Sequence, residues 1–186
     1  QWLLDPIDGT KTYVRGVPLF TTLVGVLFRG KPVVGVIYNP VTGEMASAAT
    51  GHGARNEFGE AIRVSERIDF SESWIGITDP ADLERRRPGL PAAIGGTCQA
   101  IRTWADGYGY LLVARGDIDA MADPIVNPWD VAPLGVVITE AGGIATSFEG
   151  TDEDLPSSFV ASCTRPIHTE LLRLISNGSR TDADRA

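Results

Sequence analysis

Two acidic residues, Asp5 and Asp8, stand three positions apart where an apolar run gives way to a Gly-Thr pair. Two carboxylates at a strand end concentrate negative charge, which is unfavourable unless a cation neutralises it. Gly9 and Thr10 would open a short helix whose backbone N–H groups suit a phosphate. Asp-Pro and Asp-Gly are also ordinary turn dipeptides, so a plain turn is the alternative explanation.

A third carboxylate, that of Asp130, is predicted at the start of a helix. Asn127 is a good N-cap and Pro128 suits the first helical position, while Gly142 can end the helix. Asp130 then falls in the first turn, where the helix dipole stabilises a negative charge. Taken alone, this stabilisation explains why an acid stands at position 130 without any catalytic or binding role.

Together the two segments resemble the signatures of the inositol monophosphatase family of metal-dependent sugar phosphatases. The family signature W-x-x-D-P-[IL]-D-G-T stands here at residues 2–10. The second signature, which begins W-D-x-A and ends E-A-G-G, stands at residues 129–143. The resemblance extends to about residue 175 and implies an α-β-α-β-α layered fold.

The resemblance also implies a set of metal ligands. Asp5 would bridge two divalent ions, Asp8 and Asp130 would bind the second ion, and the Ile7 carbonyl would complete the first site. Hard oxygen ligands suit Mg²⁺, with two or three ions per site in the intact protein. Two such ions would polarise the phosphoryl group and stabilise the attacking and leaving oxygens while water attacks in line.

The catalytic and phosphate-binding roles follow from the same resemblance. Thr10, together with Asp8, would be catalytic, with Thr10 orienting or helping to deprotonate the attacking water. The amides of Gly9 and Thr10 would hold the phosphate. Family members carry a metal-binding Glu and an acid that partners the Thr upstream of the first signature. We therefore expect the chain to be an N-terminally truncated piece of a longer protein with an incomplete first metal site.

The expected substrate is histidinol phosphate. Residues 103–110, with Lys11 after the Gly-Thr pair, resemble the histidinol-phosphatase branch of the family. Histidinol phosphate carries an ammonium and an imidazole, and Asp106 and Asp123 would bind such a cationic group. Asp106 could instead only cap its helix, and Trp104 and Tyr110 are expected to fill the core. The alternatives are an inositol monophosphatase, a 3′-phosphoadenosine 5′-phosphate phosphatase, or a catalytically inert metal-binding fragment.

Composition limits the class of protein further. The chain has 186 residues, 43% hydrophobic and 22% charged, with a mean hydropathy of +0.01. These values exclude a disordered chain, a collagen-like repeat and a membrane bundle. A formal net charge of −8 repels phosphate backbones. Cys98 and Cys163 form no CxxC pair, so we expect no disulfide framework. We expect a cytoplasmic homodimer that binds a small phosphorylated metabolite, but neither nucleic acid nor a membrane.

The expected architecture is an α+β or α/β layered sandwich, one compact unit with a shared active-site cleft. Residues 1–70 would form an antiparallel sheet portion that carries the first motif, residues 71–178 an α/β portion with a mixed sheet and the second motif, and residues 179–186 a disordered tail. In the first portion, hydrophobic runs and turn residues predict strands at 2–4, 19–28, 33–38, 44–49 and 62–64. In the second, strands at 74–77, 101–103, 118–122 and 159–161 accompany helices at 82–87, 106–114, 128–141 and 166–176.

Overall fold

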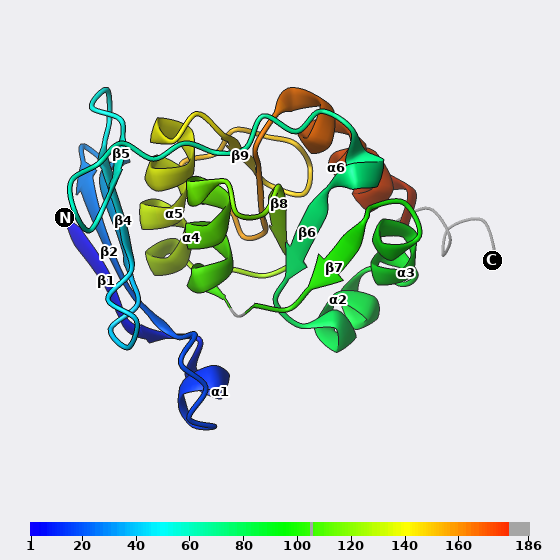
Figure 1. Ribbon diagram of the computed structural model, residues 1–186, viewed down its shortest axis with the longest axis horizontal. Helices are drawn as coiled ribbons and strands as arrows, with labels where there is room; N and C mark the ends of the chain where they lie inside the picture. The colour runs from blue at the N-terminus through cyan, green and yellow to red at the C-terminus, as the bar shows by residue number, and fades with distance from the viewer. Residues whose placement is uncertain (105, 179–186) are drawn as a thin grey trace.

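The computed structural model describes residues 1–104 and 106–178. The predicted tail at 179–186 lies outside these residues. The elements form a layered sandwich of two sheets and the helices that pack on them (Figure 1). No helix among the described residues is both long and apolar enough to cross a bilayer.

The first sheet is antiparallel throughout, as predicted. Its strand order follows the chain, and neighbouring strands are joined by short connections, except that helix α1 (Thr10–Tyr13) lies between the first two strands. The buried and partly exposed positions alternate along its second strand, because one face packs on helices and the other does not. The strands are β1 (Trp2–Asp8), β2 (Thr21–Phe28), β3 (Lys31–Tyr38), β4 (Met45–Ala49) and β5 (Ala54–Asn56).

The strand predicted at 62–64 is wrong. Only an isolated bridge between Arg55 and Ala61 continues the sheet there. The Ile62 amide donates to the carbonyl of Ala54, but the Val64 amide donates to the carbonyl of Ala141 at the end of a helix. The chain leaves the sheet at this point because its next hydrogen-bond partner lies in another layer.

The second sheet is mixed, again as predicted. It has the order β7-β6-β8-β10-β9, in which β6 runs parallel to β7 and β8, while β10 runs antiparallel to β8 and β9. Every residue of β8 and β10 is buried, as expected for strands covered on both faces. The strands are β6 (Trp74–Ile77), β7 (Ala100–Arg102), β8 (Ala120–Asp123), β9 (Ile144–Thr146) and β10 (Phe159–Ser162).

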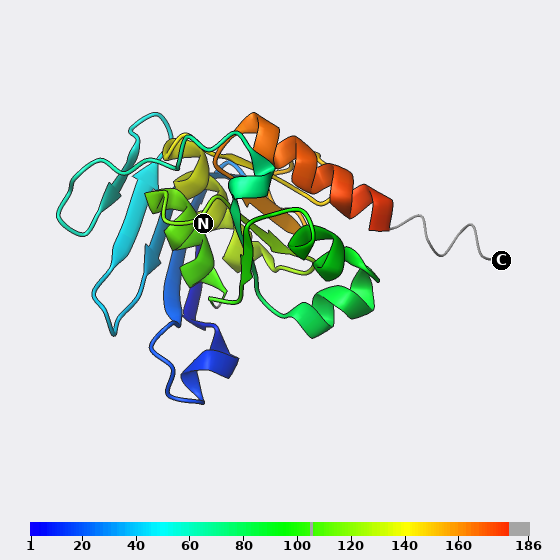
Figure 2. The same ribbon diagram turned by 45° about the vertical axis from the view of Figure 1, so that its right-hand side comes forward.

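Helices fill the space between the sheets and cover the far side of the second sheet (Figure 2). The two helices between the sheets are α4 (Gly107–Arg115) and α5 (Pro128–Glu140). The outer helices are α2 (Pro80–Arg86), α3 (Leu90–Gly95), α6 (Arg165–Gly178) and the single-turn η1 (Phe70–Glu72). Neither α3 nor β9 was predicted, because both are too short to show a clear hydrophobic period.

The first sheet and α5 pack with almost no space between their backbones. A Cβ atom built on Gly35 of β3 would lie 2.2 Å from the carbonyl oxygen of Pro133 in α5. On β2, a Cβ on Gly25 would lie 3.1 Å from the ring of the same proline. Glycine at these two positions therefore lets α5 lie directly on the sheet.

Replacing Gly35 with alanine should therefore destabilise the fold. The new methyl group meets backbone atoms that cannot rotate away, so we expect Gly35→Ala to lower the free energy of unfolding by about 1–3 kcal/mol. The matched control is Gly135→Ala in α5, where the nearest atom to the new Cβ is 3.9 Å away. That change should be neutral or stabilising by up to about 1 kcal/mol, since alanine favours a helix. Urea unfolding of both variants measures the difference, and equal effects would contradict the close-packing argument.

Candidate functional site

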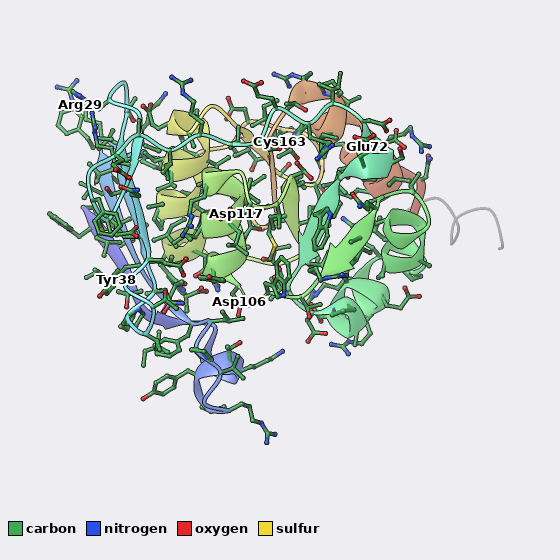
Figure 3. The ribbon with its side chains drawn as sticks, viewed as in Figure 1. Arg29, Tyr38, Glu72, Asp106, Asp117 and Cys163 are labelled. Carbon is green, nitrogen blue, oxygen red and sulfur yellow. The ribbon has the colours of Figure 1, made fainter. Side chains whose placement is uncertain are left out.

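The ends of one strand and three helices lie close together at one end of the layered sandwich, where they line a cleft. The end of β1, the start of α1, the start of α4 and the start of α5 contribute Asp8, Thr10, Asp106 and Asp130 to its lining. Figure 3 shows Asp106 at the end of α4 that faces the α1 segment. An adjoining pocket shares several of these residues and also includes Asp123 at the end of β8.

A β-bulge places the first two carboxylates on the same side of β1. The register pairs Asp5 with Leu23 and Asp8 with Thr21, so β1 advances three residues while β2 advances two. In a regular strand, residues three apart point to opposite faces. The extra residue in the bulge reverses this phase, so that both acids line the cleft.

The capping arrangement of α5 adds the third carboxylate. Asp130 accepts hydrogen bonds from the backbone amide of Asn127 at 2.8 Å and from its side-chain amide at 3.1 Å, both at Oδ2. This is a capping box between the N-cap residue and the third helical residue. The predicted helix start is confirmed, and it holds Asp130 at the cleft.

These three carboxylates form a compact cluster. One oxygen each of Asp5, Asp8 and Asp130 lies within 4.8 Å of the other two. In every case one oxygen is held by protein donors: Asp5 Oδ1 accepts from the Ile7 amide, and the Oδ2 atoms of the other two are held by groups on β2, α4 and the α5 cap. Over residues 1–104 and 106–178, the second oxygen of each accepts no hydrogen bond. Three oxygens are thus available to a ligand.

The electrostatics of the cluster favour a cation. Burial, assisted by the charges of Asp106 and Asp130, raises the pKa of the Asp8 carboxyl to about 7, against the hydrogen bonds from Thr21 and Gly107 that lower it. Burial also raises the pKa of Asp130, with the charge of Asp5 acting in the same direction. A bound cation would remove this mutual repulsion. Carboxylate oxygens without other partners are the ligands Mg²⁺ prefers, so the residues fit this ion.

Next to the cluster, the start of α1 offers backbone donors. Gly9 has a left-handed conformation with φ of 78° and is the N-cap residue of α1. Among the described residues, the amides of Gly9 and Thr10 have no hydrogen-bond acceptor, which leaves them free for an anion. The hydroxyl of Thr10 donates to the Ile7 carbonyl at 3.0 Å. The predicted water-orienting group and the predicted carbonyl ligand therefore lie side by side.

The two acids expected to bind substrate line the adjoining pocket. Burial raises the pKa of Asp106, which the nearby charge of Lys11 opposes, and the Asp106 side chain makes no capping hydrogen bond to α4. Burial raises the pKa of Asp123 to about 7 despite hydrogen bonds from the hydroxyls of Thr78 and Tyr110. Asp106 is the N-cap residue of α4, but its carboxylate accepts no capping hydrogen bond and lines the cleft instead.

The aromatic residues near this pocket have packing roles, as predicted. Tyr110 is 1% exposed, and its ring centroid lies 5.4 Å from that of Phe159. Trp104 stacks on Trp74, with ring centroids 6.0 Å apart. Their contacts belong to the core between the layers.

Sequence reasoning missed the donors that hold Asp8. Its Oδ2 accepts from the Thr21 hydroxyl at 2.7 Å and from the Gly107 amide at 2.6 Å. A Cβ on Gly107 would lie 2.6 Å from both Asp8 Oδ2 and Thr21 Oγ1, so a side chain there would separate α4 from β1. The glycine at the predicted start of α4 was the one available signal.

Comparisons with known proteins agree with this geometry. Residues 1–179 match the inositol monophosphatase family. The chain is 36% identical to a histidinol-phosphatase of Mycobacterium tuberculosis, over 96% of this chain and 70% of that protein. It is 29% identical to the Nus factor SuhB of Pasteurella multocida, over 94% and 67%. The IMPase of Thermotoga maritima superposes with a TM-score of 0.87 at 28% identity, over 96% and 69% of the two chains. The chain belongs to the inositol monophosphatase family, whose members are metal-dependent phosphatases, and is a phosphoric monoester hydrolase.

Proposed function

We propose that the protein hydrolyses histidinol phosphate with Mg²⁺ as its cofactor. The observation that carries the reaction class is the cluster of Asp5, Asp8 and Asp130, each with one oxygen free, beside the free amides of Gly9 and Thr10. Cation ligands and anion donors in one cleft suit a phosphate ester bound through a metal ion. The choice of ester rests on the acidic pocket next to this cleft and on the similarity to a histidinol-phosphatase.

Each residue of the cleft has a separate task in this proposal. Asp5, Asp8 and Asp130 hold Mg²⁺ through their free oxygens, with the Ile7 carbonyl as a further ligand. When bound, Mg²⁺ stabilises negative charge on the phosphoryl oxygens and lowers the pKa of water. The amides at the start of α1 orient the phosphate, because they point their N–H groups at the anion. Thr10 binds the attacking water through its hydroxyl and keeps that water in line with the scissile bond.

The adjoining pocket would bind the organic part of the ester. Its lining includes the carboxyl groups of Asp106 and Asp123 close to the metal cluster, together with Asp79 and Asp82. The latter two already have cationic partners, since Asp79 pairs with Lys11 and Asp82 with two arginines of α2. Asp106 and Asp123 form no salt bridge among the described residues, although the nearby charge of Lys11 opposes the rise that burial causes in the pKa of Asp106. A ligand with an ammonium or imidazolium group would supply the missing positive charge.

We also propose that the intact protein binds two or three Mg²⁺ ions per site. We further propose that the protein forms a homodimer, which light scattering would detect. We also propose a role in histidine biosynthesis and a cytoplasmic location. The division into portions 1–70 and 71–178 is consistent with the placement of the first sheet before residue 57 and the second after residue 73.

Replacing Asp130 with asparagine should abolish hydrolysis and leave the fold intact. The asparagine keeps an oxygen for the capping bonds from Asn127, so unfolding free energy should change by about 1 kcal/mol or less. Loss of one charged metal ligand should reduce kcat/KM at least about 100-fold. Phosphate release is measured with histidinol phosphate and Mg²⁺, and addition of a chelator should abolish the wild-type activity. Near-normal turnover of Asp130→Asn would refute the metal-binding role.

Replacing Asp106 with asparagine tests the choice of ester. We expect kcat/KM for histidinol phosphate to fall about 10- to 100-fold, because a charge-assisted contact worth about 1.5–3 kcal/mol is lost. The value for inositol monophosphate, a neutral polyol ester, should change less than about threefold. Asp82→Asn is the matched control, since Asp82 lines the same pocket but is already paired with arginines. Equal losses for both esters would show that Asp106 does not select a cationic substrate.

A further inference from the structure

Thr21 is a fully buried polar residue in the apolar face of β2. Its exposed fraction is 0%, and the inward-facing residues that follow it along the strand are Leu23, Gly25 and Leu27. A buried hydroxyl is unfavourable unless it is hydrogen-bonded. Within the part of the chain that the structure describes, the Thr21 hydroxyl donates to one acceptor, Oδ2 of Asp8, at 2.7 Å. The cross-strand register places Thr21 directly opposite Asp8 after the bulge in β1.

We propose that Thr21 is a positioning residue that selects which oxygen of Asp8 is offered to the cation. This inference rests on the proposed role of Asp8 as a Mg²⁺ ligand. The Thr21 hydroxyl and the Gly107 amide both donate to Oδ2, from β2 and from the start of α4. With Oδ2 held from two sides, rotation of the carboxylate is opposed, and Oδ1, which accepts no hydrogen bond among the described residues, stays available to the cation.

Without these donors, the cluster would not keep its arrangement before the cation binds. Three carboxylates with oxygens within 4.8 Å of one another repel, and rotation of one carboxylate away relieves the repulsion. Two charge-assisted hydrogen bonds on Oδ2 oppose that rotation. Of the two donors, only the Thr21 hydroxyl can be removed by a side-chain substitution, because Gly107 donates through its backbone.

The same geometry explains why threonine suits the position. The Thr21 hydroxyl lies 2.6 Å from the place where a Cβ on Gly107 would stand, so β1, β2 and α4 are in close contact here. Valine has nearly the shape of threonine but cannot donate a hydrogen bond. Serine keeps the hydroxyl and lacks only the methyl group. The pair Thr21→Val and Thr21→Ser therefore separates hydrogen bonding from packing.

Mg²⁺ binding to the metal-free chain tests the inference, measured by titration calorimetry with no substrate present. We expect Thr21→Val to weaken Mg²⁺ binding at least about 10-fold, and Thr21→Ser to remain within about threefold of the wild type. Thr22→Val is the matched control, because Thr22 is the next residue of β2 and its hydroxyl donates to the Pro6 carbonyl instead of a carboxylate. It should leave Mg²⁺ affinity within about threefold of the wild type.

Activity measurements then separate positioning from chemistry. In phosphate release, Thr21→Val should raise the half-saturating Mg²⁺ concentration by a similar factor, with kcat at saturating Mg²⁺ within about threefold of the wild type. Equal Mg²⁺ affinity of Thr21→Val and the wild type, or a Thr21→Ser variant as weak as Thr21→Val, would overturn the inference. If Thr21→Val does not fold, Thr21→Ala replaces it with the same expectations. A wild type that binds Mg²⁺ but releases no phosphate would refute the proposed function, while the binding data would still decide the role of Thr21.

Discussion

Repulsion among three carboxylates is the constraint on which this end of the molecule depends. Asp5, Asp8 and Asp130 hold oxygens within 4.8 Å of one another, although each would be more stable apart from the others in the absence of a cation. Donors hold one oxygen of each carboxylate, and all three residues line a shared cleft. The raised pKa of Asp8, about 7, shows that burial and crowding penalise its charged form. The same penalty favours the binding of a divalent ion.

The packing of the layers determines whether the three carboxylates can lie this close together. Asp130 reaches the cleft because α5 lies directly on the first sheet, where Gly25 and Gly35 leave room for the backbone around Pro133. Asp8 keeps its orientation because α4 comes close enough for the Gly107 amide to reach it. Both helices lie between the two sheets, so their positions are set from both sides (Figure 1). Rigid packing far from the cleft therefore determines the distances within it.

The acids proposed to bind the organic part of the substrate form a second group, whose environment differs from that of the carboxylate cluster. Asp123 is buried at the end of β8 with two hydroxyl donors, and its pKa is raised to about 7. Asp106 lies at the start of α4 without a side-chain capping bond. Neither forms a salt bridge among the described residues, although Lys11 acts on Asp106 electrostatically, whereas Asp79 and Asp82 in the same pocket are in salt bridges. This difference in pairing indicates which acids have charge left for a ligand.

The sequence by itself was sufficient to predict the features that depend on residues close together along the chain. Alternating and continuous apolar runs predicted most strands, and Asn127 and Pro128 predicted where α5 begins. The two signature segments identified the acids at 5, 8 and 130. Short elements such as α3 and β9 were not predicted, because a few residues show no hydrophobic period and their neighbours in space stabilise them.

Tertiary structure alone decided how those acids meet and what holds them. The bulge between Asp5 and Asp8 depends on pairing with β2; Pro6 within the segment is compatible with a bulge but does not by itself set the register. The donors to Asp8 lie 13 and 99 residues away along the chain, at Thr21 and Gly107. A hydrogen bond depends on distance and direction in space, and residues so far apart acquire both only when the sheets and helices pack.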